Sequence, residues 1–134
     1  MPPEKSEEVR AWLHKARHDL LAAARLLEGE APLADVAVYH CQQAGEKALK
    51  AYLTANDHLF GKTHSLVELT LAAAETDPSF LALRQQAESL TPFVSRFRYP
   101  GVSIDPDLDE AHSALRMAAE VLEFVTARIS GLSP

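Results

Sequence analysis

Residues 39–50 read YHCQQAGEKALK, and this stretch decides how the chain folds. A helix turns by about 100° per residue, so a helical stretch divides its side chains between two faces. Small and apolar side chains gather on one face: Val38, Cys41, Ala44, Gly45, Ala48, Leu49 and Tyr52. The opposite face, which we call the polar stripe, carries Tyr39, His40, Gln43, Glu46, Lys47, Lys50 and Thr54. The pattern predicts one helix that packs with its first face and presents hydrogen-bonding groups on its second.

The polar stripe has two interpretations. Its amide, imidazole, carboxylate and ammonium groups suit contact with a polar or anionic partner. A solvated helix face is the ordinary alternative, since surface helices carry polar residues on the side away from the core. On the apolar face, Gly45 costs about 1 kcal/mol relative to alanine, which predicts the close approach of another helix there.

Start and stop signals predict further helices on both sides of this stretch. Ser6 precedes two glutamates and is expected to be the N-cap of a first helix over residues 6–28. The helix that carries the polar stripe is expected over residues 33–55. Ser65 and Glu68 have the spacing of a capping box, which predicts the start of a short third helix.

An aspartate followed by proline precedes each of the last two helices. Asp77 and Asp105 both stand in this position, which is typical of an N-cap followed by proline in the first turn. In the fourth helix the apolar spacing continues through Pro92, which predicts a single kinked helix. The fifth helix is expected to last to about Ile129, before Gly131.

The apolar arc of the fifth helix is wider than one core stripe needs, because Met117 and Phe124 lie to one side of it. Either this helix is the most buried one, or these two side chains face a second subunit in a homodimer. No strand pattern, internal repeat or long linker interrupts the helices. We therefore predict one all-α domain over residues 1–134, an antiparallel up-and-down helical bundle of four main helices plus a short fifth.

The composition limits the class of protein. The 134 residues carry a formal net charge of −6, which argues against a general nucleic-acid coat protein, whose binding depends on neutralising phosphates. Acids dominate residues 105–123, whereas arginine and histidine recur along the first helix. An anion is therefore better placed near the first two helices and the pair Arg96 and Arg98 than near the last helix.

Cysteine and histidine usage indicates the compartment and the absence of metal chemistry. Cys41 is the single cysteine and has no partner for an internal disulfide, which predicts a reducing compartment. No leader pattern or membrane-length apolar run is present, so we expect a cytoplasmic protein. His14 and His18 stand one helical turn apart, but no third ligand accompanies them, so neither a metal nor a cofactor is predicted.

Two short motifs carry the remaining candidate groups. Residues 62–65 read KTHS before a helix start, where free amides and a lysine can hold a phosphate. The alternative is that Thr63 and Ser65 only cap the helix. Residues 95–100 read SRFRYP, in which guanidinium groups beside an aromatic ring suit a phosphate and a base. Arginines also favour a helix C-terminus for electrostatic reasons alone.

In this order and spacing, the motifs resemble the HEPN domain family, named for higher eukaryote and prokaryote nucleotide-binding. The resemblance includes Trp12 and Asp19 of the first helix and covers roughly residues 10–128. It implies a helical bundle that acts as a nucleotide- or RNA-binding partner module, paired with a minimal nucleotidyltransferase in a toxin-antitoxin-like system. The candidate ligand-binding residues are Gln43, Lys47, Lys50, Lys62, His64, Arg96, Arg98 and Tyr99.

The chain departs from the ribonuclease members of that family. These carry an arginine and, a few residues later, a histidine that suits acid or base catalysis. At the positions where the histidine would follow Arg98 stand Ser103, Ile104 and Asp105, so no catalytic residue is predicted. Two alternatives stay open. One is a metal-independent ribonuclease that uses Arg98 with a displaced base, and the other is a structural dimerisation module whose polar stripe binds only protein.

Overall fold

The computed structural model describes residues 1–97, 99–101 and 104–132. Every regular element in this part of the chain is a helix. The α-helices are α1 (Pro3–Leu26), α2 (Ala34–Ala55), α3 (Leu66–Thr76), α4 (Arg84–Leu90) and α5 (Leu108–Arg128). Two short 3₁₀ helices flank α4, and they are η1 (Pro78–Leu83) and η2 (Thr91–Val94). Each helix in the described ranges is too short or too polar to span a bilayer.

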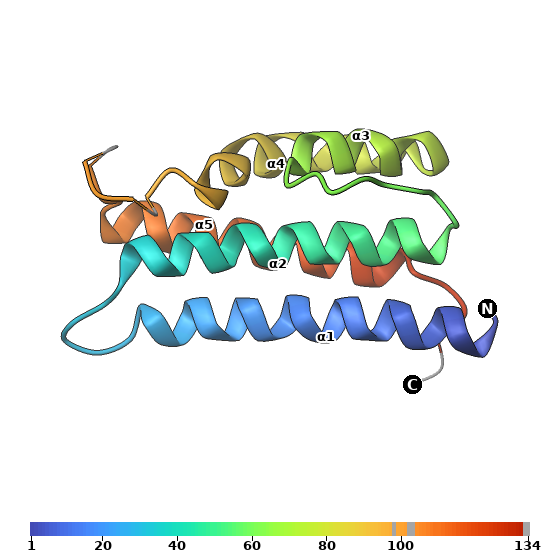
Figure 1. The fold of residues 1–134 in the computed structure, drawn as a ribbon, viewed down its shortest axis with the longest axis horizontal. Coiled ribbons are helices and arrows are strands. Elements are labelled where there is room, and N and C mark those ends of the chain that lie inside the picture. Colours follow the sequence, from blue (N-terminus) through green and yellow to red (C-terminus); the bar gives the residue numbers. More distant parts are fainter. Residues whose placement is uncertain (98, 102–103, 133–134) are drawn as a thin grey trace.

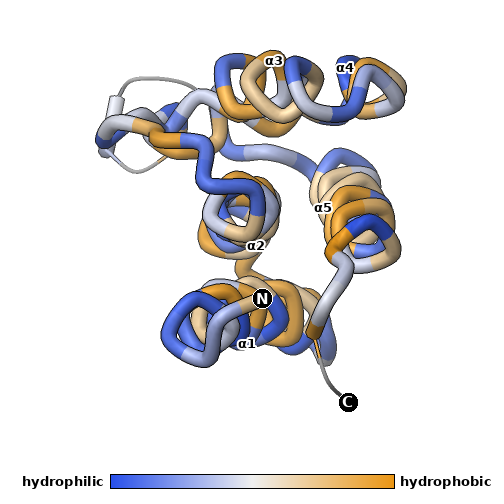
Figure 2. Tube along the Cα trace, turned by 90° about the vertical axis from the view of Figure 1, so that its right-hand side faces the viewer, coloured by the Kyte–Doolittle hydropathy of each residue, from blue (hydrophilic) through white to orange (hydrophobic). Residues whose placement is uncertain are grey.

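The helices form an up-and-down bundle around α2. In Figure 1, α1, α2, α4 and α5 run alternately in opposite directions, and α3 runs in the direction of α2. Viewed from the end in Figure 2, α2 lies among α1, α5 and the pair formed by α3 and α4, and it contacts all of them. The predicted fold, an all-α bundle of four main helices plus a short one, is confirmed.

The central position of α2 agrees with its apolar face. Its buried apolar residues are Ala37, Val38, Cys41, Ala44, Ala48, Leu49, Ala51, Tyr52 and Leu53. Burial raises the pKa of the Cys41 thiol to about 12, so this group is a packing element and not a nucleophile. A β-carbon built on Gly45 would lie only 2.7 Å from Cδ2 of Leu66, the first residue of α3. The predicted close approach of another helix at Gly45 is therefore confirmed.

Two of the four predicted helix caps are confirmed, and two are wrong. The hydroxyl of Ser65 accepts a hydrogen bond from the amide of Glu68, and the carboxylate of Asp77 accepts one from Ser79. In contrast, α1 begins at Pro3, because proline suits the first helical position and lets the helix extend past Ser6. Ser6 is buried inside the first turns of α1.

The second wrong cap is at the start of α5. The cap is Asp107, whose carboxylate accepts a hydrogen bond of 2.7 Å from the amide of Glu110. Asp105 and Pro106 belong to the connection before the helix. Three aspartates alternate with other residues in this segment, and only the side chain in register with the first free amides can cap the helix.

The predicted kinked helix is divided into η1, α4 and η2. Its apolar spacing is correct, since Phe80, Leu83 and Leu90 are all buried. Pro92 has no amide hydrogen, and the chain around it tightens into a 3₁₀ turn. The hydroxyl of Thr91 donates to the carbonyl of Ala87 at 2.6 Å, which satisfies one of the last carbonyls of α4.

Phe124 on α5 belongs to the core of its own chain. Its ring is half-buried, and its centroid lies 5.1 Å from that of Phe80. The guanidinium of Arg128 covers the ring at 3.4 Å from its centroid. Met117 is also half-buried and borders a surface depression near Arg96. Part of the wide apolar arc of α5 is thus explained within one subunit, and the homodimer stays a prediction.

Candidate functional site

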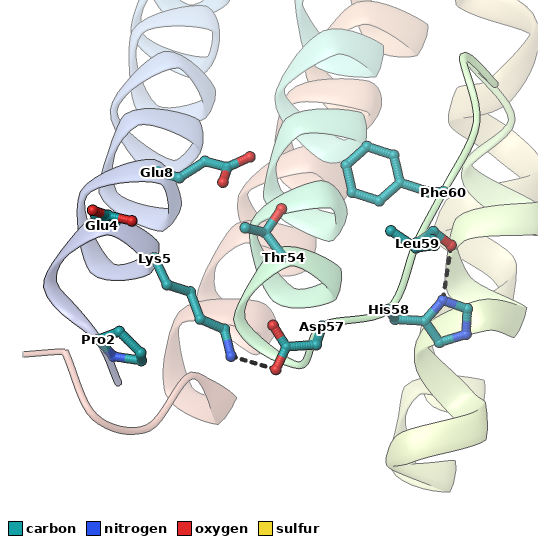
Figure 3. A pocket seen from close by; sticks show the side chains of 9 residues that line it. All are labelled: Pro2, Glu4, Lys5, Glu8, Thr54, Asp57, His58, Leu59 and Phe60. Carbon is teal, nitrogen blue, oxygen red and sulfur yellow. Dashed lines mark hydrogen bonds and ion pairs between the residues drawn. The ribbon is translucent and has the colours of Figure 1, made fainter.

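A groove at one end of the bundle is lined by none of the predicted site residues. It encloses about 610 Å³ between the first turns of α1 and residues 54–60 (Figure 3). Its walls carry Glu4, Glu8 and the ion pair of Lys5 with Asp57, whose Nζ and Oδ2 atoms are 2.7 Å apart. The groove is predominantly acidic, so it suits an anionic ligand poorly.

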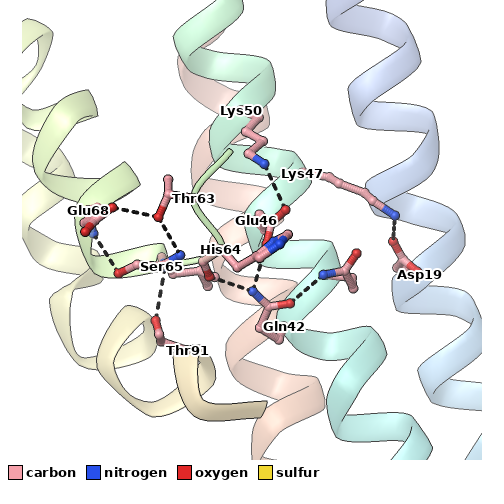
Figure 4. Close-up of polar contacts among 12 residues, drawn as sticks. Asp19, Gln42, Glu46, Lys47, Lys50, Thr63, His64, Ser65, Glu68 and Thr91 are labelled. Carbon is pink, nitrogen blue, oxygen red and sulfur yellow. Dashed lines mark hydrogen bonds and ion pairs between the residues drawn. The ribbon is translucent and has the colours of Figure 1, made fainter. Parts of the chain in front are cut away.

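The polar stripe of α2 contains a buried network centred on Glu46. Its carboxylate is 5% exposed and contacts three side chains (Figure 4). Oε2 accepts from Nζ of Lys50 at 2.9 Å, and Oε1 accepts from Nε2 of Gln42 at 3.0 Å. Nδ1 of His64 lies 3.0 Å from the same Oε1. One carboxylate on α2 therefore binds its own helix and the loop that leads to α3.

Gln42 strengthens this connection and was missed by the sequence analysis. Its side chain is fully buried, and Nε2 also donates to the backbone carbonyl of His64 at 2.9 Å. Its Oε1 accepts from Nε2 of Gln43 at 2.7 Å. The one available signal is that Gln42 stands four residues before Glu46, a spacing at which helical side chains meet.

Burial and hydrogen bonding act in opposite directions on Glu46. Burial raises the pKa of this carboxyl, but the hydrogen bonds from Gln42, Lys50 and His64, together with the charge of Lys50, lower it more. The net pKa is below the ordinary glutamate value, so the group is ionised at neutral pH. A buried carboxylate with several donors is the arrangement in which such a charge is tolerated.

Lys50 lies on the polar stripe beside Glu46, but it is buried, so a solvated helix face is the wrong interpretation at this position. Its side chain is 8% exposed. Nζ lies 5.7 Å from the ring centroid of Trp12 on α1 and 5.6 Å from that of Phe60 in the loop after α2. Both rings favour a cation over their faces. The ammonium group is thus held inside the protein by one carboxylate and two aromatic rings.

Lys47 is also neutralised within the chain. Its Nζ lies 2.6 Å from Oδ2 of Asp19 on α1, and Nδ1 of His40 lies 2.8 Å from the other oxygen of that carboxylate. The Asp19 side chain is 12% exposed, so this cluster lies at the edge of the interface between α1 and α2. Neither lysine of the stripe is therefore an uncompensated positive charge.

The amides at the start of α3 are already bonded. The hydroxyl of Thr63 accepts from the amide of Ser65 at 3.1 Å, and that of Thr91 accepts from the amide of Leu66 at 3.1 Å. The hydroxyl of Ser65 accepts from the amide of Glu68 at 3.2 Å. The expectation that Thr63 and Ser65 cap the helix is confirmed. Phosphate binding by Lys62 stays a prediction, to which these three bonded amides lend no support.

The KTHS and SRFRYP motifs lie at different places. Lys62 and His64 are exposed in the loop before α3, and His64 contacts Glu46 of α2. Arg96 lies against α5, in a depression of about 430 Å³ that it shares with Glu88 and Glu110. Tyr99 is 61% exposed in the connection between α4 and α5, and Arg98 lies outside the described residues.

Comparison with known proteins gives the family. A family model described as the HEPN domain matches residues 9–129. The chain belongs to the HEPN domain family. The crystal structure of ST0689, an archaeal HEPN homologue, is similar with a TM-score of 0.73 at 25% sequence identity, covering 92% of this chain and 98% of that one. No curated protein matches the chain.

In this HEPN domain, four of the predicted ligand-binding residues come together. Gln43, Lys47 and Lys50 lie on α2, and the Glu46 network brings His64 beside them. Among the four, His64 is the most exposed, with 61% of its side chain accessible. The surface around Gln43 and His64 is therefore the candidate ligand-binding face, and the lysines contribute to its framework.

Proposed function

We propose that this HEPN domain is a nucleotide- or RNA-binding partner module. The observation that carries the proposal is the Gln42–Glu46–His64 network. Buried charged and polar groups are seldom the most stabilising choice, and apolar residues of similar volume often serve a fold as well. Here these groups hold an exposed imidazole and an amide at the surface of α2. Such a costly arrangement in support of exposed polar groups is typical of a functional site.

The proposed ligand meets this face through hydrogen bonds more than through net charge. Lys47 and Lys50 are paired with Asp19 and Glu46, so they do not supply free phosphate-binding charge. We assign phosphate recognition to Lys62 of the KTHS motif and, separately, to Arg98 of the SRFRYP motif, and we assign base contact to Tyr99. Guanidinium groups bind phosphate through paired hydrogen bonds, and exposed tyrosine rings stack on unpaired bases. Contact with an unpaired base favours a single-stranded ligand, whose bases are accessible.

Titration of fluorescein-labelled single-stranded RNA tests the proposal. Arg98→Ala is expected to weaken binding by about 1 to 3 kcal/mol, because a charge-assisted contact to phosphate is lost. Arg84→Ala is the matched control, since Arg84 pairs with Glu88 on the surface of α4. Equal RNA affinities of the wild type and Arg98→Ala would contradict the assignment of Arg98 to phosphate recognition. Cleavage of the RNA in EDTA, lost in Arg98→Ala, favours the metal-independent ribonuclease instead.

The proposal also includes two protein partners. One is a second copy of this chain, as expected from the family resemblance and from the half-buried Met117 on α5. Light scattering at micromolar concentration checks this, and a monomer contradicts it. The other is a minimal nucleotidyltransferase. A gene for such an enzyme beside this one, together with co-purification of the two proteins, would support the pairing.

A structural dimerisation module is the second candidate, and the charge arrangement favours it. The net charge is −6, and both lysines of the polar stripe are internally paired. A module of this kind forms the dimer but binds neither labelled RNA nor labelled nucleotide. The same titration therefore separates the two functions.

A further inference from the structure

His64 is connected to the protein through one edge of its ring. Nδ1 lies 3.0 Å from the buried carboxylate of Glu46, while 61% of the side chain is exposed. A neutral imidazole carries its proton on one nitrogen, and the hydrogen bond made by one nitrogen sets the state of the other. An ionised carboxylate accepts only, so it places the proton on Nδ1 and leaves Nε2 as a lone-pair acceptor.

The backbone of His64 is held by the same network. Gln42 donates to the carbonyl of His64 at 2.9 Å and to Oε1 of Glu46 at 3.0 Å. The loop therefore cannot rotate the imidazole away without breaking buried hydrogen bonds. Both the position of the ring and its tautomer depend on Glu46.

Two other histidines of the chain also contact carboxylates, but they lack this support. His58 pairs with Glu75, whose side chain is 71% exposed, and His40 pairs with Asp19, which Lys47 also binds. Neither carboxylate is as buried as that of Glu46, which also accepts a hydrogen bond from the buried amide of Gln42. His64 is thus the exposed imidazole with the most completely built support.

We propose that Glu46 is the positioning residue for His64, and that it presents Nε2 of the imidazole as the group that contacts the ligand. The inference rests on the proposed function, since it names the residue pair that acts in that site. A ligand hydroxyl, such as a ribose 2′-OH, donates to an imidazole nitrogen of this kind. Within this proposal the ligand is a ribonucleotide or RNA, because the deoxy counterpart lacks the 2′-OH that donates to Nε2.

Nuclear magnetic resonance of the imidazole nitrogens tests the positioning without any ligand. At about pH 8, long-range nitrogen–proton correlations of the wild type are expected to show His64 with its proton on Nδ1. The double variant Glu46→Met/Lys50→Met removes the carboxylate and its buried cation together, and apolar pairs of similar volume are often tolerated. In that variant the Nδ1–H form of His64 is expected to lose its dominance.

Two controls separate positioning from general damage to the fold. Lys50→Met alone leaves the contact between Glu46 and His64, so the His64 tautomer is expected to persist. His40 and His58 keep their carboxylate partners in every variant, so unchanged signals from both report an intact fold. An unchanged His64 tautomer in the double variant overturns the proposal.

Binding of labelled single-stranded RNA, and of the matched DNA, completes the test. The double variant and His64→Ala are each expected to weaken RNA binding about three- to tenfold, and combining them adds no further loss. Additive losses, or equal binding of RNA and DNA, overturn the role of Nε2. A wild type that binds neither polymer, but keeps a Glu46-dependent tautomer, overturns the proposed function and supports the positioning.

Discussion

Two carboxylates on neighbouring helices each bind one lysine and one histidine, but their surroundings differ. Asp19 on α1 pairs with Lys47 and His40 at the edge of the helix interface. Glu46 on α2 pairs with Lys50 and His64 and is enclosed, with an additional amide donor from Gln42. The same pairing of a carboxylate with a lysine and a histidine therefore has two different structural roles. The first joins two helices at their surface, and the second fixes a loop to the core.

Glu46→Ala tests the enclosed cluster and is expected to have the largest effect. It leaves the Lys50 ammonium buried without a carboxylate, which costs about 3 to 5 kcal/mol of unfolding free energy. Urea denaturation measures the loss. A loss below about 1 kcal/mol would mean that the Lys50 ammonium reaches water easily. The Glu46 cluster would then be no more enclosed than the Asp19 cluster.

Lys50→Ala is expected to cost less, about 1 to 3 kcal/mol, because Glu46 retains its hydrogen bonds to Gln42 and His64. Its sequence neighbour Leu49 is fully buried, and Leu49→Ala is expected to cost about 2 to 4 kcal/mol. Urea denaturation of both variants gives the comparison. A negligible loss of unfolding free energy for Lys50→Ala, beside a large one for Leu49→Ala, would mean that Lys50 is exposed to solvent.

The Glu46 cluster should also respond to acid. Hydrogen bonds hold the folded-state pKa of Glu46 below its ordinary value of 4.5. Its stabilisation is therefore complete above that value and is lost as the pH falls through the folded-state pKa. The stability difference between the wild type and Glu46→Met/Lys50→Met is expected to shift in favour of the variant as the pH falls below 4.5. All other acidic side chains are common to the two proteins. A stability difference that does not change with pH would therefore contradict the role of Glu46.

Lys47→Ala is expected to have the smallest effect. The Lys47 side chain is 23% exposed, and partly exposed ion pairs contribute about 0.2 to 1 kcal/mol. The same urea experiment applies, with Lys5→Ala as the control because its partner Asp57 is exposed. If Lys47→Ala costs as much as Lys50→Ala, the Asp19 cluster is as essential to the core as the Glu46 cluster.

The fold was predictable because its signals are local. The apolar face of α2 and the caps at Ser65 and Asp77 depend on residues within one or two turns, and all three are confirmed. The caps proposed at Ser6 and Asp105 failed where a neighbouring residue allowed an alternative start. Local signals therefore identify helices better than they locate helix ends.

The candidate site was only partly predictable, because burial of a polar side chain depends on tertiary contacts. Lys50 lies at a polar helical position, yet Trp12 and Phe60 cover it from remote parts of the sequence. The meeting of His64 with Glu46 likewise depends on the path of the loop after α2. Helical periodicity contains no information about either contact.

The hydroxyl of Thr91 has a consequence for how the bundle opens. It accepts from the amide of Leu66 at the start of α3 and donates to Ala87 in α4. One small group thereby joins the beginning of one helix to the end of another, more than twenty residues away. We expect the start of α3 and the end of α4 to open together. Their backbone amides should then exchange with deuterium as one cooperative unit. Release of the His64 loop would then require this whole unit to open, which makes the loop slow to rearrange.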